Sequence, residues 1–160
     1  MRRKDREIKD LDTIKKIIER AAVCHIAMCS NGVPYLAPMN FGFDGENIYL
    51  HSFPEGKKID LLKENPQLCI GITENLECIT SAESVCETSM KYSSVIINGK
   101  AEFIAEKKEK IEALKYIVQQ YYRNMDDEKK YSTEKLLENY SGELAVFRVK
   151  IEKITGKQSN

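Results

Sequence analysis

IYLHSFPEGKKIDLL, residues 48–62, combines a short strand, a turn and the beginning of a helix. Its apolar first residues predict the strand, Pro-Glu-Gly predicts the turn, and Lys57 and Lys58 open the helix. Such a passage brings backbone N–H groups, hydroxyls and cationic side chains close to one point, which is how many proteins bind a phosphate. We therefore expect a local anion site here.

The composition narrows the classes of protein to consider. A chain of 160 residues is long enough for one domain with a full core, and we expect a single domain over residues 1–160 whose charged arm, residues 1–9, orders only against another surface. Lys plus Arg and Asp plus Glu both number 25, so a general nucleic-acid partner is not expected. No apolar run approaches a membrane span, and the N-terminus does not resemble a secretory signal, which favours a cytoplasmic protein.

The five cysteines are an odd number without a CxxC pair, which is typical of reduced thiols, most of them small core residues. Cys24, His25 and Cys29 could in principle bind zinc. However, residues 24 and 25 point to opposite faces of a strand, so we expect no metal site.

The first part of the chain predicts one helix followed by three antiparallel strands. Asp12 or Thr13 can cap the helix, and the strands are predicted at residues 23–28, 33–43 and 48–51. Ser-Asn-Gly and Asp-Gly-Glu-Asn provide the two hairpin turns between them. Pro38 cannot donate to a ladder, so it marks an edge, a bulge or a change of sheet.

The second part adds strands and helices in alternation. We predict an irregular loop with a strand edge over residues 74–91, and a bend or bulge at Asn98-Gly99. The remaining predicted elements are strands at residues 67–73, 92–105 and 143–153, helices at 57–64 and 106–124, and a short helix from Thr133 through Leu137. Mostly antiparallel strands with helices between them favour a closed barrel over a doubly wound sheet.

Several residues could carry chemistry, and each also has a plain structural explanation. His51 ends a strand beside Ser52, yet it could equally be a hydrogen-bonded surface histidine. Lys57 and Lys58 could be a solvated helix face, although positive charge at a helix start opposes the macrodipole, and a bound anion would relieve that repulsion. Residues 38–40 could offer free backbone groups to a ligand, or could simply bend the barrel.

Six motifs, in this order and spacing, resemble those of the 5-nitroimidazole resistance (Nim-type) proteins, which belong to the pyridoxamine 5'-phosphate oxidase-like flavin-binding split barrels. They are MRRKDREI, CHIAM, PYLAPMNFGF, IYLHSFPEGKKIDLLKENP, YSSVIINGKAEFI and AVFRVKIEKITGK. The resemblance implies a mainly β fold with a six-stranded antiparallel barrel and flanking helices. It also implies a homodimer with FMN between the subunits and a small-molecule substrate.

The resemblance also implies roles for individual residues. Pro38, Met39 and Asn40 would line the isoalloxazine ring, largely through backbone groups. His51 and Ser52 would lie beside the flavin, and Gly56, Lys57 and Lys58 would hold its phosphate. Tyr92, Ser93, Ser94 and Val95 match a further motif that approaches the cofactor. His51 is the residue that the resemblance associates most closely with activity.

Two hypotheses follow for function. The first is an FMN-dependent oxidoreductase that reduces nitroaromatic or similar small acceptors, with His51 orienting the substrate or supplying a proton. The second is a non-catalytic protein that binds FMN, F420 or heme, and a structural dimer with an empty groove is a third possibility. The residues 156–160, GKQSN, lack the arginine of the true oxidases' substrate motif, so oxidation of vitamin B6 is not expected. Lys57 stands where relatives often carry arginine. A lysine presents a point charge to a phosphate, whereas an arginine presents a bidentate guanidinium.

Overall fold

The computed structural model describes residues 3–80, 88–122, 137, 140 and 142–159. The helix predicted from Thr133 lies outside these residues, apart from Leu137. The helices are η1 (Lys4–Arg6), α1 (Leu11–Arg20), α2 (Lys57–Glu64) and α3 (Lys107–Tyr122). The strands are β1 (Glu7–Ile8), β2 (Cys24–Ser30), β3 (Val33–Met39), β4 (Gly42–Phe43), β5 (Asn47–Ser52), β6 (Gln67–Ile79), β7 (Ser89–Phe103) and β8 (Ala145–Ser159).

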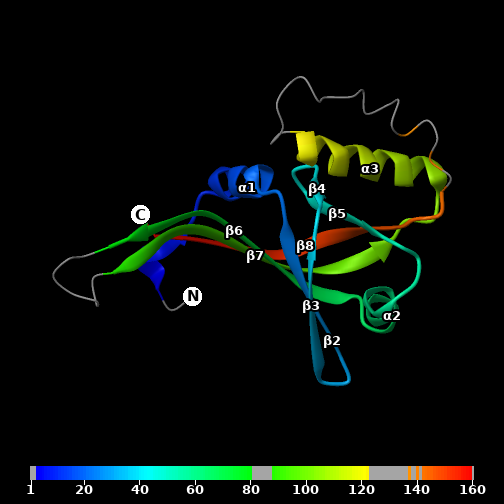
Figure 1. Cartoon of the computed structure of the whole chain (residues 1–160), viewed down its shortest axis with the longest axis horizontal. Coiled ribbons are helices and arrows are strands. Elements are labelled where there is room, and N and C mark those ends of the chain that lie inside the picture. The colour runs from blue at the N-terminus through cyan, green and yellow to red at the C-terminus, as the bar shows by residue number, and fades with distance from the viewer. Residues whose placement is uncertain (1–2, 81–87, 123–136, 138–139, 141, 160) are drawn as a thin grey trace.

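The described strands pair in the order β3-β2-β6-β7-β8-β5-β4, with β1 added to β8, and every pairing is antiparallel. Helices α1 and α3 lie on one side of this sheet, as Figure 1 shows. The predicted mainly β split barrel with flanking helices is confirmed, but with eight strands rather than six. Two of the eight, β1 and β4, are only two residues long.

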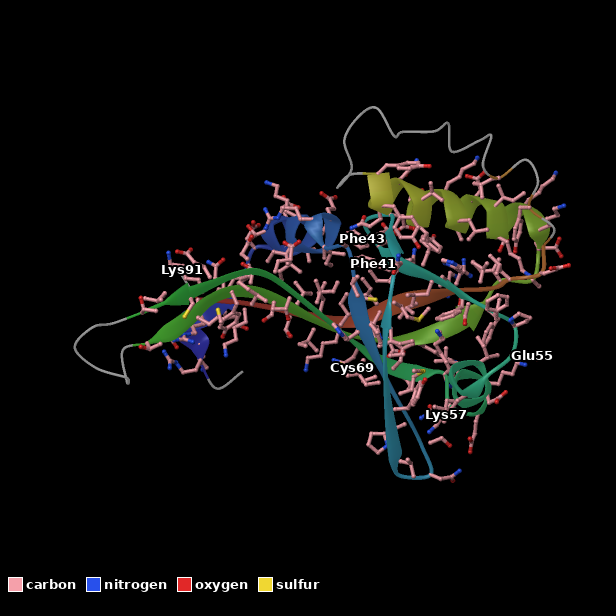
Figure 2. All side chains as sticks on the ribbon, viewed as in Figure 1. Phe41, Phe43, Glu55, Lys57, Cys69 and Lys91 are labelled. Atoms are coloured by element: carbon pink, nitrogen blue, oxygen red, sulfur yellow. The ribbon has the colours of Figure 1, made fainter. Side chains whose placement is uncertain are left out.

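A single stretch of chain connects the two ends of the sheet. β3 pairs with β2 at one end of the strand order, whereas β4 pairs with β5 at the other end. Only Asn40 and Phe41 separate β3 from β4 in sequence, so the sheet must curl toward itself. Phe41 is fully buried, and Figure 2 shows it with Phe43 where β4 meets α3.

Both predicted hairpin turns are confirmed. Asn31 and Gly32 have φ values of 50° and 76°, the left-handed pair of a type I′ turn between β2 and β3. In the second turn, the Asp44 carboxylate accepts hydrogen bonds from the backbone N–H groups of Glu46 and Asn47. Pro34 and Pro38 lie on β3 at one end of the strand order, so Pro38 marks an edge.

Helix α1 begins two to three residues earlier than a cap at Asp12 or Thr13 would allow. Its cap is Asp10, whose carboxylate accepts from Thr13 N at 3.0 Å. At the other end, the buried side-chain amide of Gln120 on α3 donates to three carbonyls, those of Ile18, Glu19 and Ala21, at 2.7–3.0 Å. The Ile18 carbonyl also accepts from the Ala21 N–H, so Gln120 adds hydrogen bonds at carbonyls of the last turn of α1, where few intrahelical donors remain.

The segment 74–91, predicted as an irregular loop with a strand edge, contains more strand than predicted, at both of its ends. β6 continues to Ile79 and β7 starts at Ser89, and the two strands remain paired across a bulge between Glu74 and Glu77. Residues 81–87 lie outside the described set. Residues 74–79 are strand because they pair with β7. Their own sequence is polar and does not alternate, so it gives no local strand signal. The predicted bulge at Asn98-Gly99 is confirmed by the shift in the β7–β8 register.

The last strand is longer than predicted and reaches Ser159. Its added residues Lys157 and Gly156 pair with Glu7 and Ile8 of β1. Ile8 is buried, so part of the predicted N-terminal arm packs against the chain's own sheet. The far part of β6, β7 and β8 forms a ribbon that extends well beyond α1 in Figure 1.

Candidate functional site

The end of β5 and the start of α2 form the first group of predicted site residues. His51 and Ser52 pair with Val146 and Ala145 at the start of β8, and both are half-buried. Gly56 precedes α2 with a φ of +112°, a left-handed value that favours glycine. Because Gly56 has no side chain, no side-chain cap covers the first N–H groups of α2.

Lys57 and Lys58 place two positive charges at the start of α2. Neither ammonium forms an ion pair with a carboxylate in the described part of the chain. The Lys57 Nζ lies 4.9 Å from the centroid of the Tyr35 ring on β3. Lys58 is half-buried, and this burial lowers its pKa. Two cations at an uncapped helix start are unfavourable alone, and an anion would compensate both.

His51 has an unsatisfied nitrogen. Its Nδ1 is buried and has no hydrogen-bond partner among the described residues. Burial lowers the pKa of His51, and the nearby charge of Lys58 lowers it further, so the imidazole is neutral at neutral pH. A buried polar atom without a partner costs about 1–3 kcal/mol, and such atoms often belong to functional sites. Phe53, two residues after His51, is 78% exposed.

Residues 38–40 lie at the end of β3. Pro38 and Asn40 are exposed, whereas the Met39 side chain is 6% exposed and belongs to the core. The Met39 side chain is therefore not available to a ligand. The Asn40 side chain hydrogen-bonds the Tyr121 hydroxyl of α3.

The remaining predicted site residues, Tyr92 to Val95, lie far from His51 in the fold. It pairs with residues 159 to 156 of β8, and Gly156 lies ten residues along that strand from Val146, the partner of His51. At about 3.3 Å per residue this places the motif roughly 30 Å from His51. In Figure 2, Lys57 lies beside α2 and Lys91, the residue before Tyr92, lies on the ribbon at the opposite side of the view.

Two polar side chains of that motif, those of Tyr92 and Ser94, already have partners. Hydrogen bonds from Lys157 and Arg6 lower the pKa of Tyr92, and the Lys157 Nζ also lies 5.6 Å from the centroid of the Tyr92 ring. Ser94 Oγ donates weakly to the Lys157 carbonyl at 3.4 Å, and Val95 is fully buried. Tyr92 and Ser93 line a shallow hollow of about 290 Å³ with Asn75, Glu77, Lys91 and Ser159.

Sequence reasoning missed Tyr35 and the exposure of Phe53. The alternation in PYLAPMN puts Tyr35 on the same face of β3 as Met39, which is a usable signal. That alternation cannot show that Lys57 lies over the ring, because the contact depends on how α2 docks. No local signal predicts that Phe53 stays exposed.

The described residues contain neither a metal-binding cluster nor a membrane-spanning helix. No three His, Cys, Asp or Glu side chains are grouped closely enough to hold a metal ion. Within the same part of the chain, no helix has the length and apolar character needed to cross a membrane. The four described cysteines are free, and burial raises the pKa of the Cys24 thiol to about 12.

Comparison with known proteins identifies the family. Residues 10–158 match the family described as pyridoxamine 5'-phosphate oxidase. The chain is 33% identical to a candidate 5-nitroimidazole antibiotic resistance protein from Bacteroides thetaiotaomicron, with a TM-score of 0.75 over 95% of this chain and 86% of that one. A FAD and heme binding protein from Mycobacterium smegmatis shares the fold, with a TM-score of 0.78 and 20% identity over 97% of this chain and 74% of that one.

A curated protein of Rhizobium meliloti (strain 1021), described as uncharacterized, is 24% identical over 84 residues, which is 52% of this chain. The match spans about half of that relative, 48% of its length. The match over residues 10–158 covers nearly the whole chain, and the Bacteroides protein confirms the resemblance to the 5-nitroimidazole resistance proteins. This chain therefore belongs to the pyridoxamine 5'-phosphate oxidase family.

Proposed function

We propose that this protein binds FMN and reduces a nitroaromatic or similar small acceptor. The observation that carries the proposal is the juxtaposition of the His51 nitrogen with two lysines, none of which has a polar or carboxylate partner among the described residues. The bound flavin would supply the electron-transfer chemistry. The chain must then hold the phosphate, orient the acceptor and manage a proton.

The start of α2 suits the phosphate. A phosphate there would accept hydrogen bonds from the uncapped N–H groups that follow Gly56, and its charge would offset Lys57 and Lys58. The half-buried position of Lys58 strengthens this attraction, because partial exclusion of water lowers the local dielectric. Riboflavin, which lacks the phosphate, should bind more weakly for the same reason.

His51 suits the acceptor side. A neutral imidazole donates from one nitrogen and accepts with the other, so it can orient a small polar substrate and exchange a proton with it. Burial keeps His51 neutral, so it does not repel an approaching electron-deficient ring through an added positive charge of its own. Phe53 offers an aromatic face next to the same strand end.

A homodimer is part of this proposal, and the outer face of the sheet supports it. One cross-strand row on that face, Pro38-His25-Gly71-Ile96-Thr155, carries no Asp, Glu, Lys or Arg. The neighbouring row, Leu36-Ala27-Cys69-Asn98, is uncharged until it reaches Lys153 on β8. Leu36 is 61% exposed and Ile96 is 43% exposed. Exposed uncharged surface of this kind is typical of interface cores, and a second copy could carry its residues 92–95 toward this site.

The absorbance spectrum of freshly purified protein tests the cofactor. We expect flavin absorbance, release of a mass equal to FMN on heating, and tighter binding of added FMN than of riboflavin. A protein that carries no flavin and binds no added FMN would refute the proposal. A heme band in place of flavin absorbance would instead favour a heme protein, a function carried by the Mycobacterium smegmatis neighbour.

Anaerobic reduction tests the activity. NAD(P)H or a flavin-reducing partner should bleach the bound flavin, and a nitroaromatic compound should restore its colour. If no reductant bleaches the flavin, the second hypothesis, a non-catalytic flavin carrier, is the better description. Sedimentation of the same sample measures whether the protein is a dimer.

A further inference from the structure

We infer that Tyr35 positions Lys57 for the phosphate of the bound cofactor, an inference that rests on the proposed function. The Lys57 Nζ lies 4.9 Å from the centroid of the Tyr35 ring, within the range of a cation–π contact. Lys57 is otherwise exposed and has no ion pair with a described carboxylate. Tyr35 is therefore the group that restrains this ammonium.

An aromatic ring restrains an ammonium without neutralising it. A carboxylate would offset the charge of Lys57 and accept its hydrogen bonds, leaving less for a ligand. The ring attracts the cation through its quadrupole, so the charge and the outward N–H donors remain available. A free lysine side chain has considerable rotamer freedom, and holding it before the ligand arrives reduces the entropy lost on binding.

The position of the ring is itself fixed. Tyr35 pairs with Met28 across the β2–β3 ladder and packs against the main core. A shift of β3 would therefore disturb both the ladder and the core. The ring is a rigid support rather than a mobile surface group.

The helix that carries Lys57 is fixed to the same hairpin at its other end. The Asn65 side-chain amide donates to the Cys29 carbonyl at 2.8 Å, and the Asn31 side-chain amide donates to Glu64 at 3.0 Å. Figure 2 shows Lys57 at the end of α2 beside this hairpin. Because α2 is fixed to the hairpin at its C-terminal end and its Ile59 and Leu62 side chains are buried, the fold determines where the Lys57 ammonium lies relative to the ring.

A double-mutant cycle on the full chain, with FMN and riboflavin as probes, tests the inference. Tyr35→Leu should weaken FMN binding by about two- to fivefold, the size of an exposed cation–π contact, and should leave riboflavin binding unchanged. Tyr35→Phe keeps the ring and should retain the affinity for FMN. In a Lys57→Met background, Tyr35→Leu should have no further effect on FMN, because the group it positions is gone.

Three outcomes would overturn the inference while FMN binding itself stands. One is an equal loss of FMN and riboflavin affinity in Tyr35→Leu, which would indicate a structural role. Another is an additive effect of Tyr35→Leu and Lys57→Met, and the third is unchanged FMN affinity in Tyr35→Leu. If the wild-type protein binds neither FMN nor riboflavin, the proposed function fails, and this inference fails with it.

A second series keeps the test valid if Tyr35→Leu does not fold. Phenylalanine with increasing ring fluorination at position 35 keeps the shape of the side chain but weakens the attraction of the ring for a cation. FMN affinity should fall stepwise along this series, with riboflavin affinity constant. A flat series would overturn the inference.

Discussion

The predicted cofactor residues that pair with the two ends of β8, on β5 and on β7, have very different surroundings. At the near end, where Val146 pairs with His51, the histidine nitrogen and the α2 lysines lack polar partners among the described residues. At the far end, where Gly156 to Ser159 pair with β7, Tyr92 and Ser94 already bond to Lys157. A group of polar residues is therefore a good candidate for ligand binding only if some of its polar atoms lack partners within the protein.

The largest expected effect is at the near end. His51→Ala should lower turnover of a nitroaromatic acceptor by about 100-fold or more, the usual contribution of a proton-transferring side chain. The flavin content of the purified variant is the control and should not change. Tyr92→Phe at the far end should lower turnover less, because that hydroxyl is already engaged. Equal losses of turnover in His51→Ala and Tyr92→Phe would contradict the view that only the near end takes part in the reaction.

The far end should matter more for stability. A Cβ on Gly156 would lie 2.7 Å from Ile14 of α1 and 3.1 Å from Ile8 of β1. Gly156→Ala should therefore lower the free energy of unfolding by about 1–3 kcal/mol, measured by urea denaturation. Gly71→Ala is the matched control, since its Cβ would contact only Ile96, at 3.8 Å. Similar unfolding midpoints for the two variants would contradict tight packing of α1 and β1 against β8 at Gly156.

A smaller effect is expected for the phosphate. Lys57→Met should weaken FMN binding by about tenfold, because a hydrogen bond to a charged group contributes about 1.5 kcal/mol or more. Lys63→Met, an exposed lysine in the last turn of the same helix, should leave the affinity unchanged. Fluorescence titration measures both. A comparable loss in Lys63→Met would indicate that only the overall charge matters.

The smallest effect concerns the pKa of His51. Lys58→Met removes a positive charge that lowers this pKa, so the pKa should rise, while burial still holds it below the ordinary value. Because the folded-state pKa is depressed, the unfolded chain binds the proton more readily, and His51 reduces stability as pH falls below about 6.5. NMR titration of the imidazole measures the shift, with exposed His25 as a reference signal. An unchanged pKa would show that Lys58 does not act on His51.

Local signals explain what could be predicted. Strand β5, the turn at Gly56 and helix α2 were predicted closely, because Pro-Glu-Gly and Asn65-Pro66 mark their limits in the sequence itself. The extended pairing of β6 and β7 was not predicted, since polar residues 74–79 pair only because another strand lies beside them. Gln120 was missed because a polar residue in a helix gives no sign of three distant carbonyl partners.

The site shows the same division. The residues grouped around His51 are close in sequence, so their proximity follows from one strand, one turn and one helix. The distance to Tyr92 depends on the β7–β8 register, and the position of Tyr35 under Lys57 depends on how α2 docks against the β2–β3 hairpin. Such relations require the tertiary structure.

The prolines of β3 have a further consequence for how copies of this protein avoid aggregation. Pro34 and Pro38 are four residues apart on one strand, so both occupy the alternate positions whose N–H would point away from β2. Neither proline has an N–H, and the outer edge of β3 therefore lacks two of the donors that another strand would need to add itself there. These two prolines thus make the edge of β3 a poor template for uncontrolled sheet growth.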